Sequence, residues 1–381
     1  MSYTVSQSFP HPILDLKEGP FISVYIPTSR VNTEAHDNSV RYKNQLKNIE
    51  IELEKKYDRK NFESLFTTLK DLGNDKDFWN YQLDGLGVLA AKDQCVVFKL
   101  QREVKEFSTV SETFYIKPLL NAYQTDDSYQ ILALNRNDFK LYEGNRYAIR
   151  EIDIPPEEKK SFKEIVGTFY EEEHKTQISM GSSGKTMFGG GGGSTRDEEA
   201  IDAEKYFRYI DRLVEENYSK KTGLPLILAS LTEYHADFAK LSHNSYLMKE
   251  GIRKDPGSLS LEDLRNSAWK IMEPIYYNNI EKLSNKYELA KSREVASADI
   301  SEVARAALEN RVDVLLINLD KIVPGKISLD NDRLLTEEDN GDMLNDLALL
   351  ALKQKAKVFV VPEDKMVSDT GVMSIFRYTT S

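Results

Sequence analysis

The chain has 381 residues, 40% of them hydrophobic and 30% charged, which is typical of a soluble protein with apolar material for two or three domains. The 62 acidic residues outnumber the 51 basic ones, and the net charge of -11 argues against a protein that coats nucleic acid without specificity. The single cysteine, Cys95, excludes a disulfide framework or a thiolate metal site within the chain.

The first segment, residues 1–124, is predicted to be an α/β domain. Residues 21–26 read as a strand that Pro27 ends, and residues 85–90 and 95–100 read as two more strands. Between the strand at 21–26 and the strand at 85–90, apolar residues recur at the spacing of one helix face, which predicts two helices. The first stripe is Tyr42, Leu46, Ile49 and Leu53, and the second is Phe62, Leu65, Phe66, Leu69 and Leu72.

The second segment, residues 125–264, opens with a predicted three-stranded meander over residues 129–134, 139–142 and 147–154. A glycine-rich loop over residues 179–197 leads into a helix with one apolar face. A strand at 225–230 and a helix at 232–241 follow. This order predicts a mixed sheet with helices packed on it.

The third segment, residues 265–381, begins with a long helix and continues with a helix over residues 300–310. Residues 312–317 are apolar nearly throughout, which is typical of a strand buried on both faces. Another helix near 343–352 and strands at 358–361 and 372–378 complete the segment. We expect a small three-layer α/β unit, so the whole chain is predicted to be an α/β protein of three domains.

Five consecutive glycines, Gly189, Gly190, Gly191, Gly192 and Gly193, stand directly before the apolar-faced helix of the second segment. Glycine has no Cβ and loses much conformational entropy on ordering, so we expect this stretch to stay mobile. A glycine tip on a stiff helix suits a probe of a narrow polyanionic cleft, where side chains would clash. The alternative is a tolerated surface insertion.

The same region does not support nucleotide hydrolysis. Gly184, Lys185 and Thr186 resemble the end of a phosphate-binding loop, but Ser179 stands where its first glycine is required. The histidines form no metal-ligand pattern, and Ser194 has no apparent base. We therefore expect no metal and no cofactor.

A basic stripe continues from the glycine run into the helix. Lys205, Arg208 and Arg212 follow one another at i, i+3 and i+7, and Arg196 precedes them. Such residues are candidates for contacts with RNA phosphates. Acidic residues share the helix start, so the alternative is an exposed face of mixed charge; they are Glu198, Glu199, Asp202 and Glu204.

Four local features together resemble a known superfamily. They are the meander of residues 129–144, the glycine tip with Tyr206–Ile210 behind it, the strand and helix of residues 226–238, and residues 300–317 with 371–378. In element order they resemble the archaeo-eukaryotic class of peptide-chain release factors and their ribosome-rescue relatives, specifically the bacterial branch. The last feature is similar to the family's third domain, a small fold like that of ribosomal and kink-turn RNA-binding proteins.

The resemblance implies a partner, a process and a site. The partner is the ribosome or a structured RNA such as tRNA, and the process is translation quality control, rescue or hibernation. In release factors the tip reads Gly-Gly-Gln, whereas Ser194 follows Gly192 and Gly193 here. These three residues are the catalytic candidates, but a serine cannot place a carboxamide, so the resemblance leaves enzymatic activity open.

Two other functions are compatible with these residues. One is a non-catalytic protein–protein adaptor that keeps a decayed loop. The other is a hydrolase of peptidyl-tRNA or RNA that works without the glutamine, through Ser194 or His174.

The sequence also bears on location. Its N-terminus lacks the basic start and apolar segment of a signal peptide, and no apolar stretch approaches the ~20 residues that span a bilayer. We expect a cytoplasmic protein that binds neither membranes nor DNA, while the oligomeric state stays open.

Overall fold

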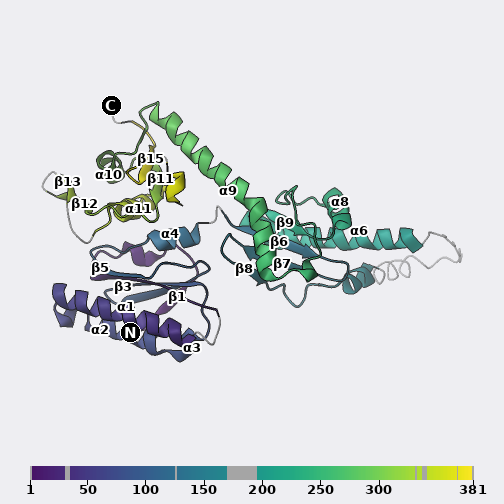
Figure 1. Ribbon diagram of the computed structural model, residues 1–381, viewed down its shortest axis with the longest axis horizontal. Coiled ribbons are helices and arrows are strands. Elements are labelled where there is room, and N and C mark those ends of the chain that lie inside the picture. Colours follow the sequence, from purple (N-terminus) through teal and green to yellow (C-terminus); the bar gives the residue numbers. More distant parts are fainter. Residues whose placement is uncertain are drawn as a thin grey trace, which may run out of the picture. The chain divides into compact units, whose positions relative to one another are not determined.

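The computed structural model describes residues 2–30, 35–124, 127–169, 195–330, 333–336, 341–366 and 368–379. Contacts within the chain gather in two compact units. Unit 1 combines Met1–Thr125 with Asn278–Ser381, and unit 2 is Asp126–Tyr277. The long helix α9 (Leu261–Lys291) contributes to both units (Figure 1).

The N-terminal part of unit 1 is built on a five-stranded sheet with the strand order β1-β4-β3-β2-β5. All neighbouring strands are antiparallel except β1 and β4, which run parallel. The strands are β1 (Thr4–Ser6), β2 (Phe21–Pro27), β3 (Gly85–Ala91), β4 (Gln94–Leu100) and β5 (Phe107–Ser111). The helices are α1 (Ala35–Lys56), α2 (Glu63–Asn74), α3 (Lys76–Trp79) and α4 (Lys117–Tyr123), with 3-10 turns at Pro12–Asp15 and Arg59–Asn61.

The two predicted apolar stripes are confirmed as the buried faces of α1 and α2, with every stripe residue at most 5% exposed. These helices cover the face of the sheet to which β2 contributes Ile22, Val24 and Ile26 (Figure 1). The opposite face of β2 carries Phe21 and Tyr25, which belong to a different core. Because strand side chains alternate between faces, β2 is buried on both sides.

The C-terminal part of unit 1 contains a second sheet with the order β10-β15-β11-β14. Strand β11 runs parallel to β14 and antiparallel to β15. The elements are β10 (Ala296–Ser297), α10 (Ile300–Leu308), β11 (Val312–Asn318), the hairpin β12 (Lys326–Asp330) and β13 (Arg333–Thr336), α11 (Met343–Lys353), β14 (Lys357–Val361), a 3-10 turn (Glu363–Lys365) and β15 (Val372–Phe376).

The two parts of unit 1 share one hydrophobic core. Phe114, Ile116 and Leu119 from the N-terminal part belong to the same buried cluster as Leu344 and Leu347 of α11. Burial of this apolar surface stabilises the association of chain segments that lie more than 200 residues apart. The three-domain division at residues 124 and 264 stays a prediction.

Unit 2 is built on a mixed four-stranded sheet with the order β8-β7-β6-β9, in which β6 and β9 are parallel and the other pairs antiparallel. Leu132 and Leu134 of β6 belong to one core with α6 and α8, whereas Tyr129 and Ile131 belong to another with α9. Figure 1 shows these helices beside the sheet. The strands are β6 (Tyr129–Leu134), β7 (Phe139–Gly144), β8 (Ile149–Ile152) and β9 (Leu226–Ala229). Helical segments are residues 162–169, α6 (Thr195–Val214), a π-helical turn (Glu215–Ser219), α7 (Lys220–Thr222), α8 (Thr232–Leu241) and a 3-10 turn (Pro256–Ser258).

Three elements of unit 2 begin at least two residues away from their predicted starts. The third strand begins at Ile149 instead of residue 147, because Asn145 Oδ1 accepts the amides of Tyr147 and Ala148 and holds a turn there. Helix α9 begins at Leu261, where Ser260 Oγ accepts the Asp263 amide as an N-cap. Helix α6 begins at Thr195, so residues 195–197 of the predicted loop are helical.

Candidate functional site

The predicted site divides at the start of α6. Gly189, Gly190, Gly191, Gly192, Gly193 and Ser194 lie outside the described residues. Arg196 lies in the first turn of α6, where the structure describes the backbone only. Lys205, Arg208 and Arg212 lie further along the same helix. We call α6 the stem helix, because the glycine run joins its N-terminus.

The stem helix is held to unit 2 by a buried apolar face. Tyr206, Phe207 and Ile210 are at most 4% exposed and belong to the core between the sheet and α8. Phe207 packs edge-on against Phe238 of α8 with ring centroids 5.7 Å apart. This contact fixes the helix against a rigid sheet.

A polar tether joins the stem helix to the segment that follows β8. The Tyr209 hydroxyl donates to Glu158 Oε2 at 2.9 Å and accepts the backbone amide of Lys159 at 3.2 Å. Burial, and then the hydrogen bond to Glu158, raise the pKa of Tyr209, which therefore stays a neutral donor.

A second tether lies near the other end of the stem helix. Asp211 is 6% exposed, and its carboxylate accepts the Ser242 hydroxyl at 2.5 Å and the His243 amide at 2.8 Å. In the π-helical turn that follows, Ser219 Oγ accepts Asn244 Nδ2 at 3.0 Å. All three bonds tie this end of the helix to the loop after α8. With the apolar face and the Tyr209 tether, three sets of contacts fix the direction of the helix.

The exposed face of the stem helix carries both charges. Arg208 pairs with Glu204 at 2.8 Å, and the two side chains are 53% and 48% exposed. Arg212 is exposed and Lys205 half-buried. An exposed pair of this kind contributes only ~0–1 kcal/mol and can exchange its partner at small cost. The stripe thus lies on one helix as predicted, and its face is of mixed charge; a role in RNA binding stays a prediction.

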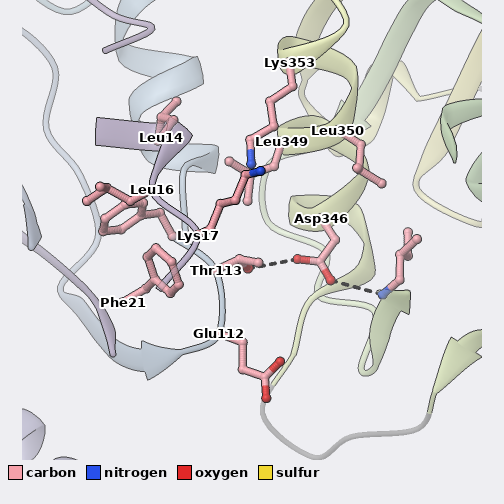
Figure 2. A pocket seen from close by; sticks show the side chains of 12 residues that line it. Leu14, Leu16, Lys17, Phe21, Glu112, Thr113, Asp346, Leu349, Leu350 and Lys353 are labelled. Atoms are coloured by element: carbon pink, nitrogen blue, oxygen red, sulfur yellow. Dashed lines mark hydrogen bonds between the residues drawn. The ribbon is translucent and has the colours of Figure 1, made fainter. Parts of the chain in front are cut away.

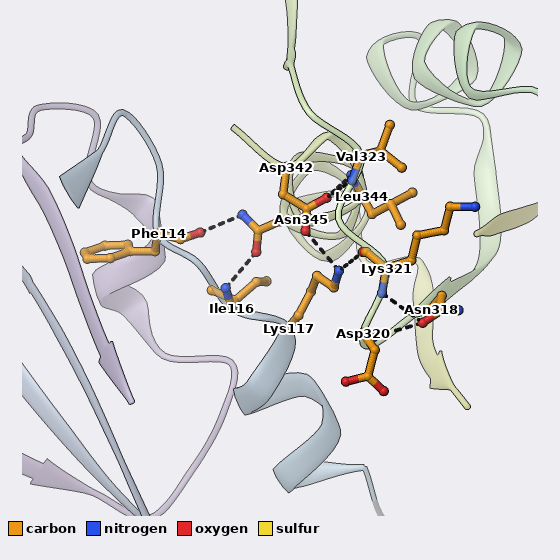
Figure 3. Close-up of polar contacts among 10 residues, drawn as sticks. All are labelled: Phe114, Ile116, Lys117, Asn318, Asp320, Lys321, Val323, Asp342, Leu344 and Asn345. Carbon is orange, nitrogen blue, oxygen red and sulfur yellow. Dashed lines mark hydrogen bonds and ion pairs between the residues drawn. The ribbon is translucent and has the colours of Figure 1, made fainter. Parts of the chain in front are cut away.

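Unit 1 contains a polar contact that no local sequence pattern predicted, between the segment Thr113–Lys117 and three side chains of the α11 region: Asp342, Asn345 and Asp346. We call it the α11 seam. Asn345 donates from Nδ2 to the Phe114 carbonyl at 2.9 Å and accepts the Ile116 amide at 2.7 Å (Figure 3). One amide side chain thereby imitates the pairing of a neighbouring strand.

Lys117 lies at the buried end of the seam. Its side chain is 0% exposed, and Nζ lies 2.9 Å from Asp342 Oδ2 and 2.6 Å from the Lys321 carbonyl oxygen (Figure 3). Burial lowers the pKa of Lys117, while Asp342 opposes that change. Asp342 Oδ1 also caps α11 by accepting the Leu344 amide at 3.1 Å. The only local signal was an N-cap aspartate before an apolar helix.

The other candidate chemistries find no support in the residues that the structure describes. No group of three or more His, Cys, Asp or Glu side chains there could hold a metal ion. Burial raises the pKa of Cys95 to about 12, so its thiol is not poised as a nucleophile. No helix among the described ranges is long and apolar enough to cross a bilayer.

A family comparison agrees with the geometry of unit 2. Residues 128–311 match the model of "Bacterial archaeo-eukaryotic release factor family 3". The region of residues 128–311 belongs to the bacterial branch of the archaeo-eukaryotic release factor superfamily. The matched range begins just before β6. It includes three of the four features on which the resemblance was based: the meander, the glycine run with the stem helix, and β9 with α8.

Solved structures are similar over most of the chain at low identity. An archaeal translation termination factor, aRF1, is 14% identical to this chain. The alignment covers 96% of this chain and 95% of aRF1, and the TM-score is 0.23. Dom34 of S. cerevisiae is 13% identical, with 78% of this chain, 79% of that chain and a TM-score of 0.39. Archaeal Pelota, in a ribosome-bound model with ABCE1, is 11% identical to this chain. The alignment covers 73% of this chain and 71% of that chain, and the TM-score is 0.42.

No curated protein matches the chain. The family assignment therefore stands on the sequence match over residues 128–311.

Proposed function

We propose that this release-factor relative binds the ribosome, or a structured RNA such as tRNA, and acts in translation quality control, rescue or hibernation. The glycine run Gly189–Gly193 would enter a narrow functional cleft. The observation that carries the proposal is the release-factor family match across residues 128–311, which contains both the run and the stem helix.

The anchoring of the stem helix supports a probing role. A loop can be presented to a cleft only if its base is held, and Phe207, Tyr209 and Asp211 each fix α6 through a different contact. A base that is already held limits the conformational entropy that α6 itself would lose on binding.

Phosphate contacts are assigned to Arg196, Lys205, Arg208 and Arg212. Arg208 is held by Glu204 in an exposed pair, which a phosphate can replace at small cost. Because such contacts release counterions, binding should weaken steeply with salt.

Hydrolysis is a separate question from binding. The glycine run is followed by Ser194 in place of a glutamine. Serine has no carboxamide to orient a water molecule, and the sequence shows no general base to activate its hydroxyl. The proposed activity is therefore binding, with peptidyl-tRNA or RNA cleavage as the alternative that a release assay decides.

A non-catalytic adaptor for another protein is the second candidate. Two observations favour it. The exposed face of the stem helix carries both charges, with Glu204 paired to Arg208, and the chain has a net charge of -11. An acidic protein of this kind would meet RNA only through a local basic surface.

Co-sedimentation with ribosomes at low and moderate salt tests the proposal. The variants are a deletion of residues 181–194, which leaves α6 intact, and Arg208→Glu/Arg212→Glu. The matched control is Lys43→Glu/Lys47→Glu, an equal charge change at exposed positions of α1 in unit 1. We expect both α6-region variants to lose binding, the reversal to lower the salt slope by about 2, and the control to sediment as the unmodified chain does.

Three outcomes separate the candidates. A chain that stays at the top of the gradient at every salt concentration contradicts the proposal. Equal loss of binding in the control indicates a non-specific charge effect. Peptidyl-tRNA release that disappears when Gly189–Gly193 become alanines would establish the hydrolase instead.

A further inference from the structure

Asp346 of α11 joins three parts of unit 1. Its Oδ1 accepts the Thr113 hydroxyl at 3.0 Å, and its Oδ2 accepts the Ile327 amide of β12 at 3.2 Å (Figure 2). Thr113 belongs to the N-terminal part of the unit, whereas β12 and α11 belong to the C-terminal part. One carboxyl group therefore connects chain segments that lie 233 residues apart.

The surroundings of Asp346 disfavour a full negative charge. The residue is 9% exposed and lines two cavities of about 280 and 770 Å³. An ionised carboxylate can accept about four hydrogen bonds, and here it accepts one from each of the two donors. Buried charge that is incompletely hydrogen-bonded is costly.

The charged groups around Asp346 leave it without an ion pair among the described residues. Asp342, the N-cap residue of α11, has the same charge, and Lys117 is paired with Asp342. Lys326 of β12 attracts the carboxylate but is paired with Glu112. Lys17 and Lys353 are exposed and point toward one another at the rim of the smaller cavity (Figure 2).

We infer that Asp346 is a proton-sensitive latch, which holds the N-terminal and C-terminal parts of unit 1 together more tightly when its carboxyl group is protonated. This goes beyond the proposed function and does not depend on it. A protonated carboxyl keeps one oxygen to accept the Ile327 amide. Its new O–H can donate to Thr113 Oγ, which then rotates to accept.

The direction of the pH effect follows from linkage. Burial raises the pKa of Asp346 from 3.8 to about 6, and the like charge of Asp342 acts in the same direction. A carboxyl whose pKa is raised in the folded state stabilises that state fully below the unfolded pKa. The stabilisation is lost as the pH rises through about 6. The seam is therefore strongest in mildly acidic solution and weaker at neutral pH.

Urea unfolding of the full chain at pH 5 and 7.5 tests the latch. A Trp269→Phe background leaves buried Trp79 of unit 1 as the reporter. Asp346→Asn is the neutral isostere, since its carbonyl can accept the Ile327 amide and its NH2 can donate to Thr113 Oγ. The control is Asp71→Asn at an exposed position of α2.

We expect the unfolding constant of the parent chain to rise between pH 5 and 7.5 by roughly tenfold more than that of Asp346→Asn. Asp71→Asn should behave as the parent does. Exchange protection of the Ile327 amide should be greater at pH 5 than at 7.5 in the parent, and equal at both in Asp346→Asn. Identical pH dependence of the parent and Asp346→Asn overturns the inference.

A direct titration keeps the inference testable if Asp346→Asn does not fold. Carboxyl carbon NMR of the parent chain should place the midpoint of Asp346 near pH 6. A midpoint in the ordinary aspartate range, near pH 4, overturns the latch whatever the variant does.

Discussion

The Tyr209 hydroxyl donates to Glu158 Oε2 at 2.9 Å, and this bond joins the stem helix to the segment behind β8. The Tyr209 hydroxyl oxygen also accepts a hydrogen bond from the Lys159 amide. Glu158 and Lys159 are neighbours in the chain, so the Tyr209 side chain alone makes both of these hydrogen bonds between that segment and the stem helix.

Tyr209→Phe should separate this tether from the apolar packing. The substitution removes the hydroxyl and leaves the ring, and we expect unfolding of unit 2 to become easier by about 1 kcal/mol. Trp269 fluorescence in a Trp79→Phe background reports unit 2. Tyr81→Phe is the control, since Tyr81 is 75% exposed, and a loss of similar size there would show that Tyr209 has no special role.

Lys117→Met should leave Asp342 buried without a cation. We expect a loss of about 3 kcal/mol in the stability of unit 1, because an unpaired buried charge is costly. The double variant Lys117→Met/Asp342→Asn should recover most of it, since asparagine can still cap α11. Lys105→Met is the exposed control for an ion pair with Asp320, with an expected change under about 1 kcal/mol. A double variant no more stable than Lys117→Met would contradict this account.

Gly251→Ala and Gly167→Ala should have opposite effects. A Cβ at Gly251 would lie 2.3 Å from His235 Cε1 and 2.5 Å from the Leu228 carbonyl oxygen, so we expect a loss of about 1–3 kcal/mol. At Gly167, within the helical residues 162–169, the new Cβ would have no atom within 4 Å among the described residues outside its own stretch of helix backbone. Alanine there should stabilise the helix by about 0.5–1 kcal/mol. Thermal unfolding of both variants measures the contrast.

His235 should make unit 2 sensitive to acid. Burial lowers the pKa of His235, and its Nε2 lies 3.0 Å from the Ile252 carbonyl oxygen. A histidine with a lowered pKa stabilises the folded state above the unfolded pKa of about 6.5 and loses that contribution as the pH falls. Unit 2 should thus weaken on acidification, the opposite of the Asp346 effect in unit 1. His235→Gln should flatten this dependence in Trp269 fluorescence, and an unchanged profile would refute it.

Periodic apolar patterns were the reliable part of the sequence. The stripes through Tyr42 and Phe62 predicted α1 and α2, because every fourth or third residue must face the sheet. Strand β5 was missed, since three of its five residues, Phe107–Ser111, are polar and it lies at a sheet edge. In β5, the Val110 amide donates a hydrogen bond to Glu52 of α1, and the Val110 carbonyl accepts one from Lys56. No local sequence pattern predicts these contacts at the sheet edge.

By itself, the sequence determined the α/β class, most of the helices and strands, and the release-factor relationship of unit 2, because local spacing and element order are written in neighbouring residues. Only the tertiary structure decided that residues 1–125 and 278–381 form one unit, and that Asn345 meets Ile116 across 229 positions. The physical reason is that a buried polar contact depends on which surfaces the folded chain brings together and on how much water it removes from them. Sequence spacing contains neither quantity.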